Sequence, residues 1–344
     1  MQINGRIIGS DQPPYVIAEI SNNHLADPDR ACRLIEIAAR SGADAVKIQT
    51  FDADSLTIDS NRPEFIIRAP PWEGLNYYQL YKKIALPRSF TERLFNVARD
   101  CGITIFSSPF DEGAVELLQT LGCPAYKIAS FEACDDPLLK AVGATGRPVI
   151  VSTGVANLAD LKESLRVLRE AGCRDIAMLH CISSYPAATR DMNLRAMDRL
   201  AELGCLVGLS DHSLGHLAAT LAVSRGAVLI EKHFTIARAD GGPDASFSLE
   251  PDELKALVIA VRDAWDALGN AGIFDQERRP GAEHARSLFV VRDVAAGATL
   301  RAEDVRAIRP GLGLPPRNLK SVVGARARRD LSRGQPLAWD DLEA

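Results

Sequence analysis

The chain has 344 residues, enough for one barrel of about 250 residues with a smaller module beside it. With 47% hydrophobic and 25% charged residues, its composition is that of an ordinary globular protein. The net charge of −5 and the lack of a basic stripe argue against nucleic acid or an anionic membrane as the main partner. We therefore expect a small-molecule partner.

The seven cysteines stand singly, form no C-x-x-C pair and are odd in number, so we expect reduced thiols instead of disulfides. The first residues lack the apolar core of a signal peptide. No run reaches the ~18 apolar residues of a membrane span. Together these features predict a cytoplasmic protein.

A small hairpin is predicted at residues 3–8, because Asn4-Gly5 is a strong turn signal, and we expect it to plug the bottom of the domain that follows. A pattern of short apolar run, terminal polar residue and helical stretch then repeats eight times. The predicted strands cover residues 15–19, 45–49, 104–107, 125–128, 149–152, 176–181, 206–209 and 228–233. Helical patterns lie between them, for example at 29–40, 90–101, 157–171 with Asn157 as N-cap, and 252–268. This order predicts a (β/α)8 TIM barrel with its active site on the loops after the strands, and a doubly wound open sheet is the alternative.

Residues 51–87 separate the second strand from the next strong helix by far more than the usual ~2–6 residues. The segment is rich in aromatic residues and contains a helical pattern at 76–83. A long loop at the catalytic face commonly serves as a lid or a substrate wall. The alternative is a peripheral packing or dimer element.

The barrel pattern ends in the polar segment 269–286, which contains Gly272, Pro280 and Gly281 and has no regular period. We assign residues 1–270 to the barrel with its hairpin, 271–286 to a linker and 287–344 to a compact β-rich module. A module of this size is marginal alone, so we expect it to pack on another domain or subunit.

Residues 208–213 and 230–235 each end a short apolar run in a segment that contains histidine. The helix predicted between them has an apolar face at Leu217, Ala218, Leu221 and Ala222, which we expect to pack on the sheet. Parallel strands joined by a helix place His212 and His233 at the same carboxyl edge. Two imidazoles there can hold a divalent metal, and the alternative is that each ring caps its strand.

Charged and hydroxyl side chains at successive strand ends are expected to converge on one pocket. They are Glu19, Lys47, Ser107, Ser108, Lys127, Ser130, Glu132, Ser152, Ser183, Ser210, His212 and His233. Two lysines with several hydroxyls predict a site for a dianion, and hence a phosphorylated substrate. Glu19 and Glu132 are the acid–base candidates, with ion pairing to Lys47 or Lys127 as the alternative role.

Seven motifs stand at these strand ends: Ala18-Glu-Ile-Ser-Asn-Asn-His24, Val46-Lys-Ile-Gln-Thr50, Phe106-Ser-Ser-Pro-Phe-Asp111, Tyr126-Lys-Ile-Ala-Ser130, Ser152-Thr-Gly154, Gly208-Leu-Ser-Asp-His212 and Glu231-Lys-His-Phe-Thr235. Together they resemble the sialic acid synthase family along essentially the whole chain. The ending resembles the antifreeze-like (SAF) domain of that family, with Arg309-Pro-Gly311 as its best marker. The resemblance implies a TIM barrel followed by a SAF domain.

Within the family, the segment 241–251, Ser183-Ser-Tyr-Pro186, and Trp72-Glu-Gly74 with Tyr78 and Tyr81 most resemble the pseudaminic acid synthase branch. That resemblance implies condensation of phosphoenolpyruvate (PEP) with 2,4-diacetamido-2,4,6-trideoxy-L-altrose and water, giving pseudaminic acid and phosphate. N-acetylneuraminate and legionaminate synthases are the alternatives within the family. A carbohydrate- or ice-binding protein on an inactive barrel, and a phosphosugar aldolase using a Lys127 Schiff base, are the alternatives outside it.

The resemblance also implies roles for individual residues. A divalent metal would be held by His212 and His233, with manganese favoured over magnesium and cobalt. The residues matching PEP positions are Lys47, Ser108, Lys127, Ser130, Ser152, Ser183 and Ser210. Those matching positions around the sugar and the acid–base chemistry are Glu19, Glu132, Tyr185 and Asp244. Arg309 would arrive from the partner subunit of a domain-swapped homodimer. We further expect Trp72 and Phe247 to form apolar walls for the methyl groups of the sugar.

Overall fold

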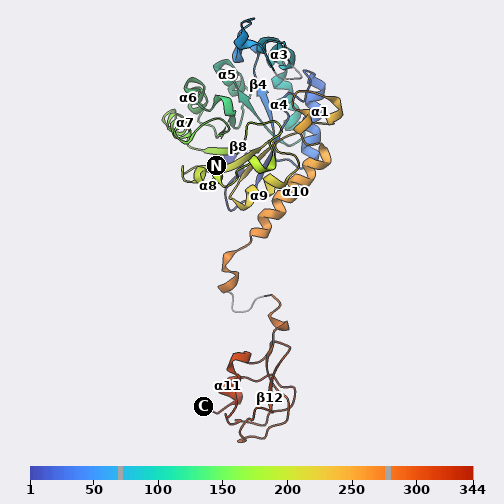
Figure 1. Ribbon diagram of the computed structural model, residues 1–344, viewed down its shortest axis with the longest axis vertical. Helices are drawn as coiled ribbons and strands as arrows, with labels where there is room; N and C mark the ends of the chain where they lie inside the picture. The colour runs from blue at the N-terminus through green and yellow to red at the C-terminus, as the bar shows by residue number, and fades with distance from the viewer. Residues whose placement is uncertain (69–72, 276–279, 344) are drawn as a thin grey trace. The chain divides into compact units, whose positions relative to one another are not determined.

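The computed structural model describes residues 1–68, 73–275 and 280–343, and the chain divides into two units, Met1–Gly269 and Asn270–Ala344 (Figure 1). In the first unit, eight parallel strands close into a barrel in the order β10, β3, β4, β5, β6, β7, β8, β9. They are β3 (Tyr15–Glu19), β4 (Ala45–Thr50), β5 (Thr104–Pro109), β6 (Tyr126–Ile128), β7 (Val149–Ser152), β8 (Ile176–Cys181), β9 (Leu206–Asp211) and β10 (Leu229–His233). The predicted TIM barrel is confirmed. The open-sheet alternative is excluded, because β10 pairs with β3.

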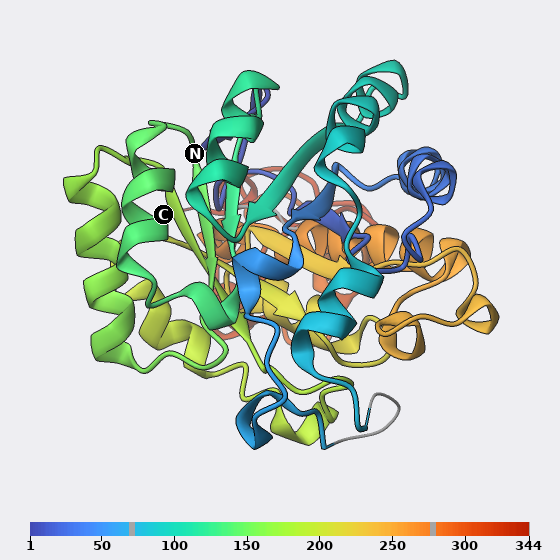
Figure 2. The same cartoon turned by 90° about the horizontal axis from the view of Figure 1, so that it is seen from above.

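A helix follows each barrel strand, and these helices surround the strands (Figures 1 and 2). They are α1 (Pro28–Arg40), α4 (Thr91–Asp100), α5 (Glu112–Thr120), α6 (Asp136–Ala144), α7 (Leu158–Glu170), α8 (Ala196–Ala201), α9 (Leu217–Ser224) and α10 (Pro251–Leu268). Helix α7 begins where predicted, because the Asn157 side chain accepts from two backbone N–H groups of the first turn. It buries Leu161, Leu165 and Leu168, one stripe of the helix, against the barrel. Within the described residues, no helix is long and apolar enough to cross a bilayer.

The buried face of α9 differs from the predicted one. Ala218, Ala219, Ala222 and Val223 are buried, whereas Leu217 and Leu221 are 55% and 48% exposed. Apolar residues occur on every side of this helix, so the i, i+3, i+4 spacing does not select a face. The predicted stripe was therefore wrong for both leucines, and the small side chains face the core instead.

The N-terminal hairpin, β1 (Gln2–Ile3) and β2 (Arg6–Ile7), lies at the amino ends of the barrel strands. Asn4 Nδ2 donates to Thr104 Oγ1, at the start of β5, and Arg6 pairs with Asp44, just before β4. Ile3 is fully buried within the same core cluster as the strands. These contacts confirm the expectation that the hairpin plugs the bottom of the barrel.

The long segment after β4 contains two further helices, α2 (Ala53–Leu56) and α3 (Tyr77–Ile84). Asn76 starts α3 through a capping box with Gln79, which places the predicted helix at 76–83 one residue further along. Arg88 pairs with Asp52 at 3.0 Å and also with Asp111, the N-cap of α5. The two ends of the insertion are thus tied to each other and to the next barrel loop.

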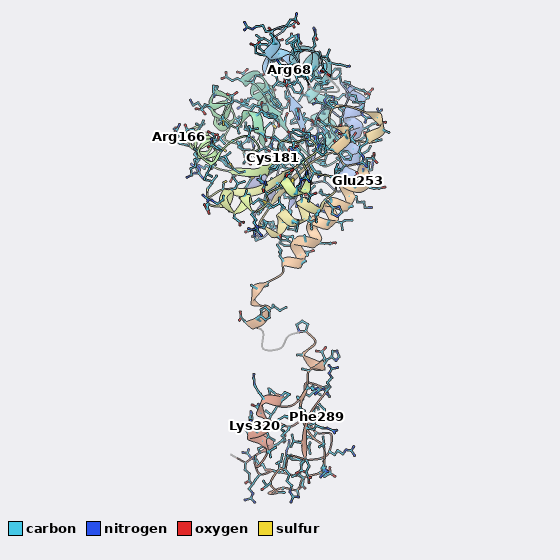
Figure 3. All side chains as sticks on the ribbon, in the orientation of Figure 1. Arg68, Arg166, Cys181, Glu253, Phe289 and Lys320 are labelled. Atoms are coloured by element: carbon cyan, nitrogen blue, oxygen red, sulfur yellow. The ribbon has the colours of Figure 1, made fainter. Side chains whose placement is uncertain are left out.

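The second unit has its own small core, formed by residues such as Leu288, Val305 and Leu337. Strands β11 (Ser287–Val290) and β12 (Val305–Ile308) pair antiparallel, and α11 (Leu319–Val322) follows. Phe289 on β11 and Lys320 on α11 are labelled in Figure 3. The module is β-rich as predicted. The expected linker, 271–286, includes residues 276–279, which lie outside the described residues.

Candidate active site

A cavity of about 220 Å³ lies at the carboxyl ends of the barrel strands. Its polar lining consists of Glu19, Ser21, Asn22, Lys47, Gln49, Lys127, Ser130, Glu132, Ser152, Tyr185, Ser210, His212, Glu231, His233 and Asp244. Most of the predicted strand-end residues therefore converge. Figure 3 shows Cys181, the last residue of β8, toward the centre of the barrel unit, with Arg166 and Glu253 at its rim.

The other predicted residues lie elsewhere. Ser107, Ser108 and Ser183 are not part of the lining, although Ser108 Oγ accepts from Lys47 Nζ at 3.2 Å. Phe247 is buried, Trp72 lies outside the described residues, and Arg309 belongs to the second unit.

Two lysines and two carboxylates form a buried ion network at the base of the cavity. Lys47 Nζ lies 2.7 Å from Glu19 Oε2 and 3.7 Å from Glu231 Oε1, while Lys127 Nζ lies 3.8 Å from that same oxygen of Glu231. All four side chains are at most 4% exposed. Their formal charges cancel, so two carboxylates already neutralise the lysines that were predicted to bind a dianion. The alternative role for Glu19, an ion pair with Lys47, is present in the structure.

Sequence reasoning missed Glu231, Gln49 and Ser21 as site residues. Each lies two positions from a predicted one: Glu231 precedes His233, Gln49 follows Lys47 and Ser21 follows Glu19. Side chains two apart on a strand share a face. The period of the strands was therefore the signal that could have found Glu231 and Gln49, whereas Ser21 lies in the turn beyond the end of β3.

Burial and charge shift the pKa values of the two carboxylates of the network in opposite directions. Burial raises the pKa of Glu19, and the neighbouring Glu231 adds to that rise although Lys47 opposes it. Burial acts in the same direction on Glu231, but Lys127 and Lys47 together lower its pKa overall. When the network takes up a proton, Glu19 is therefore the carboxylate that receives it.

Glu132 stands apart from this network, with a carboxyl oxygen that has no hydrogen-bond partner among the described residues. Burial raises its pKa to about 7, and the charge of Lys127 only partly opposes the rise. A carboxyl with this pKa can give or take a proton near neutral pH. The geometry fits the acid–base role expected for Glu132.

A hydrogen-bonded chain links Glu19 to Asp244 across the cavity. Gln49 Nε2 donates to Glu19 Oε1 at 2.9 Å and to Ser21 Oγ at 3.1 Å. Ser21 Oγ donates in turn to Asp244 Oδ2 at 2.5 Å. Ser21 has a φ of +41°, a left-handed conformation that is strained for a residue with a Cβ. Asp244 thereby joins the site as predicted, through two residues that sequence reasoning missed.

Gly154 closes a small cradle of hydroxyl groups beside Lys127 and Ser152. Its N–H donates to Ser130 Oγ at 3.3 Å, and Ser183 Oγ has no partner among the described side chains. A Cβ at Gly154 would lie 2.1 Å from Ser183 Oγ and 2.8 Å from Ser130 Oγ. The glycine lets the two hydroxyls approach the backbone closely, and the Ser183 hydroxyl, which has no partner among the described residues, can donate to an anionic oxygen.

His212 and His233 face each other with ring centroids 5.2 Å apart. His212 Nδ1 lies 2.9 Å from the carbonyl of Ile182, which leaves its Nε2 as the free ligand atom. Burial lowers the pKa of His233 well below its ordinary value, so its imidazole is neutral, the form that binds metals. His233 Nδ1 is buried and has no hydrogen-bond partner in the part of the chain that the structure describes.

The two imidazoles fit a divalent metal. No group of three or more His, Cys, Asp or Glu side chains suited to a metal occurs among the described residues. A metal held by these two rings would therefore keep coordination positions for substrate oxygens or water.

Tyr185 and Phe247 pack against the histidines. The Tyr185 ring is 4.4 Å from that of His212, and the Phe247 ring is 4.9 Å from that of His233 and 5.3 Å from that of Tyr185. Phe247 is 3% exposed and does not line the cavity. It packs behind the two histidines instead of lining the cavity, so its placement does not match the expected sugar wall.

Fold and site define a TIM-barrel protein whose charged cavity lies at the catalytic face and whose second unit is a small β-rich module. The chain belongs to the NeuB family, whose sequence model matches residues 34–272. The SAF domain model matches residues 285–343. The family recognised in the sequence motifs is thereby confirmed.

Named relatives match nearly the full length. Pseudaminic acid synthase of Helicobacter pylori is 39% identical over 96% of this chain and 98% of its own length. N,N'-diacetyllegionaminic acid synthase of Legionella pneumophila is 36% identical over 100% of this chain and 99% of its own. Among solved structures, the N-acetylneuraminic acid synthetase of Leptospira borgpetersenii is 30% identical with a TM-score of 0.72, covering 82% of this chain and 93% of that one.

Proposed function

We propose that this chain condenses PEP with 2,4-diacetamido-2,4,6-trideoxy-L-altrose and water, giving pseudaminic acid and phosphate in a metal-dependent reaction. The observation that carries the proposal is the convergence in one cavity of two facing imidazoles, two lysines and the hydroxyls of Ser130, Ser152 and Ser210. Family membership and the full-length similarity to a pseudaminic acid synthase support the reaction class and the sugar.

Lys47, Lys127 and the cradle of Ser130, Ser183 and Gly154 would hold PEP. Because Glu19 and Glu231 already neutralise the lysines, an anion entering the cavity needs a compensating proton or cation. Glu19 would take that proton, since its pKa is the raised one of the pair.

His212 and His233 would hold the divalent metal, which when bound supplies a Lewis acid for the aldehyde oxygen of the sugar. In the reaction, the enol carbon of PEP forms a bond to the aldehyde carbon, water adds to the adjacent carbon, and phosphate leaves. Glu132 would take the proton that the water loses or give one to the new hydroxyl, because its pKa of about 7 permits both states. Tyr185 and Asp244 would contact the sugar. We also place the partner subunit's Arg309 over the sugar, in a domain-swapped homodimer.

A phosphate-release assay with PEP tests the proposal across three sugars: the diacetamido trideoxy-altrose, its legionaminate counterpart and N-acetylmannosamine. The first should give the highest kcat/KM. EDTA should abolish turnover, and manganese should restore it for the unmodified chain but not for His212→Ala or His233→Ala. Efficient use of N-acetylmannosamine with poor use of the diacetamido sugar would move the chain to the neuraminate branch. Borohydride trapping of a Lys127 adduct would instead support the alternative, a phosphosugar aldolase that uses a Lys127 Schiff base.

A further inference from the structure

The cavity lining also contains hydrocarbon, in addition to the lysines, carboxylates and histidines described above. The apolar lining is formed by Phe51, Leu56, Tyr81, Ile84, Phe110 and Phe131. Leu56, Tyr81 and Ile84 come from the insertion between β4 and β5, and Phe51 and Phe110 follow the ends of those same strands.

Ring contacts hold this apolar side together before any ligand binds. The Phe51 ring meets Tyr81 edge to face at 6.2 Å and Phe110 at 5.6 Å. Tyr77 stacks on Tyr81 at 6.2 Å without lining the cavity. The ion pairs of Arg88 with Asp52 and Asp111 fix the base of the insertion. The wall is therefore preorganised, which lowers the entropic cost of binding.

The chemistry of the wall determines what it can accept. Phosphate and carboxylate groups need donors, and among these six side chains only Tyr81 carries one. Methyl groups, in contrast, gain about 0.8 kcal/mol each when hydrocarbon buries them. A hydroxyl placed there without a partner would lose free energy instead.

We propose that the wall of Leu56, Tyr81, Ile84 and Phe110 selects the second substrate by burying its C6 methyl and 4-acetamido methyl groups. This inference rests on the proposed function, because it assigns part of the same cavity to the sugar. An N-acetylhexosamine carries hydroxyls at both positions and would leave them against hydrocarbon. The insertion would thus determine which sugar the barrel accepts, while the strand ends perform the reaction.

The test compares steady-state kinetics of the full chain and its variants with the diacetamido sugar and with N-acetylmannosamine at saturating PEP. Tyr81→Ala and Ile84→Thr should raise KM for the diacetamido sugar, by about fourfold for each methyl group that loses its contact. KM for PEP should stay within about twofold, and the preference between the two sugars should shrink. Tyr81→Phe keeps the ring and should behave like the unmodified chain. Lys82→Ala, on the same helix but exposed and off the cavity, is the matched control and should also leave KM unchanged.

The proposal would be overturned by an unchanged KM for the sugar in both wall variants, or by a change confined to the KM for PEP. An equal loss in Lys82→Ala would also overturn the proposal, because the effect would then come from a general change in α3. Ile84→Thr keeps the test valid if Tyr81→Ala unfolds, which a thermal melt reveals. If the unmodified chain turns over no acetamido sugar, the proposed function itself fails. If it turns over the diacetamido sugar and the wall variants behave like it, only the role of the wall fails.

Discussion

Glu132 is the residue whose ionisation most directly couples the site to pH. Burial raises its pKa from 4.5 to about 7, so the folded chain binds this proton more tightly than the unfolded chain. The contribution of this group to the free energy of unfolding is therefore fully present at acid pH, and it is lost as the pH rises from 4.5 to about 7. Glu132→Gln, which mimics the protonated form, should stabilise the chain by on the order of 2 kcal/mol at about pH 8 and by less than about 1 kcal/mol at about pH 5. Chemical denaturation at both pH values measures this, and an equal difference at the two would contradict it.

Gly154 should prove essential to the hydroxyl cradle although it carries no side chain. A methyl group there would displace the hydroxyls of Ser183 and Ser130, which can rotate away without moving the backbone. We expect Gly154→Ala to lower kcat/KM for PEP by about tenfold or more, because charge-assisted contacts to the anion are lost. The thermal midpoint should stay within about 3 °C. Normal PEP kinetics in this variant would place the anion elsewhere in the cavity.

Residue types at strand ends predicted most of the site, because charged groups are rare inside barrels unless they serve a site. The same reasoning considered only Glu19 and Glu132 as ion-pair partners of Lys47 and Lys127. It missed Glu231, inside β10, which lies within 4 Å of both lysines. Which carboxylate meets which lysine depends on how neighbouring strands are staggered, and a single sequence does not specify that stagger.

At the level of the elements, the packing of β9 against β8 and β10 leaves no room for a side chain at Gly208. A Cβ there would lie 2.4 Å from the carbonyl oxygen of Leu229 and 2.5 Å from Leu179 Cδ2. The first neighbour is backbone in a closed barrel, so it cannot move aside. Gly208→Ala should therefore cost on the order of 3 kcal/mol of unfolding free energy. Urea denaturation checks this, with Gly154→Ala as the matched control, because its neighbours are mobile hydroxyls. Equal stability of the two variants would contradict the argument.

The strands were predictable because each is a short apolar run buried on both sides, and the ends of β4, β5 and β9 differ from the predicted ends by only one or two residues. The buried face of helix α9 could not be predicted from the spacing of its apolar residues. Its leucines have the spacing of a core stripe, yet tertiary packing places the alanines against the sheet. The insertion was predicted as a wall or lid from its length. The identity of its cavity-facing side chains required the fold, because it has no repeating period.

At the scale of the whole molecule, the two units carry opposite net charge. Residues 1–269 contain 27 basic and 35 acidic residues, whereas residues 270–344 contain 13 and 10. Opposite charge favours docking of a module on a barrel. It raises the rate of association more than the final affinity. It does not determine whether that barrel belongs to the same chain or to a second copy, so an experiment has to separate the two.

Mixing two inactive variants, His212→Ala and Arg309→Ala, under conditions of subunit exchange makes that separation. If Arg309 acts in trans, a heterodimer contains one site with both residues intact, and activity should return toward about half of the unmodified dimer. That site combines the barrel of the Arg309 variant with the module of the His212 variant. Absence of recovery despite verified exchange, or full activity of a monomer, would rule out the swapped arrangement.

The hairpin at the amino ends of the barrel also has a consequence for the order of events in time. With Ile3 and its neighbours filling the bottom, ligands reach the cavity from the carboxyl ends of the strands. Lys47 and Lys127 are 3% and 2% exposed, whereas Tyr185 and Phe131 are 45% and 66% exposed, so an anion bound at the lysines would lie beneath these aromatic rings. A sugar seated at the rim would block the way down. Turnover should therefore follow a compulsory sequence in which PEP enters first, and an excess of sugar should slow the enzyme when PEP is scarce.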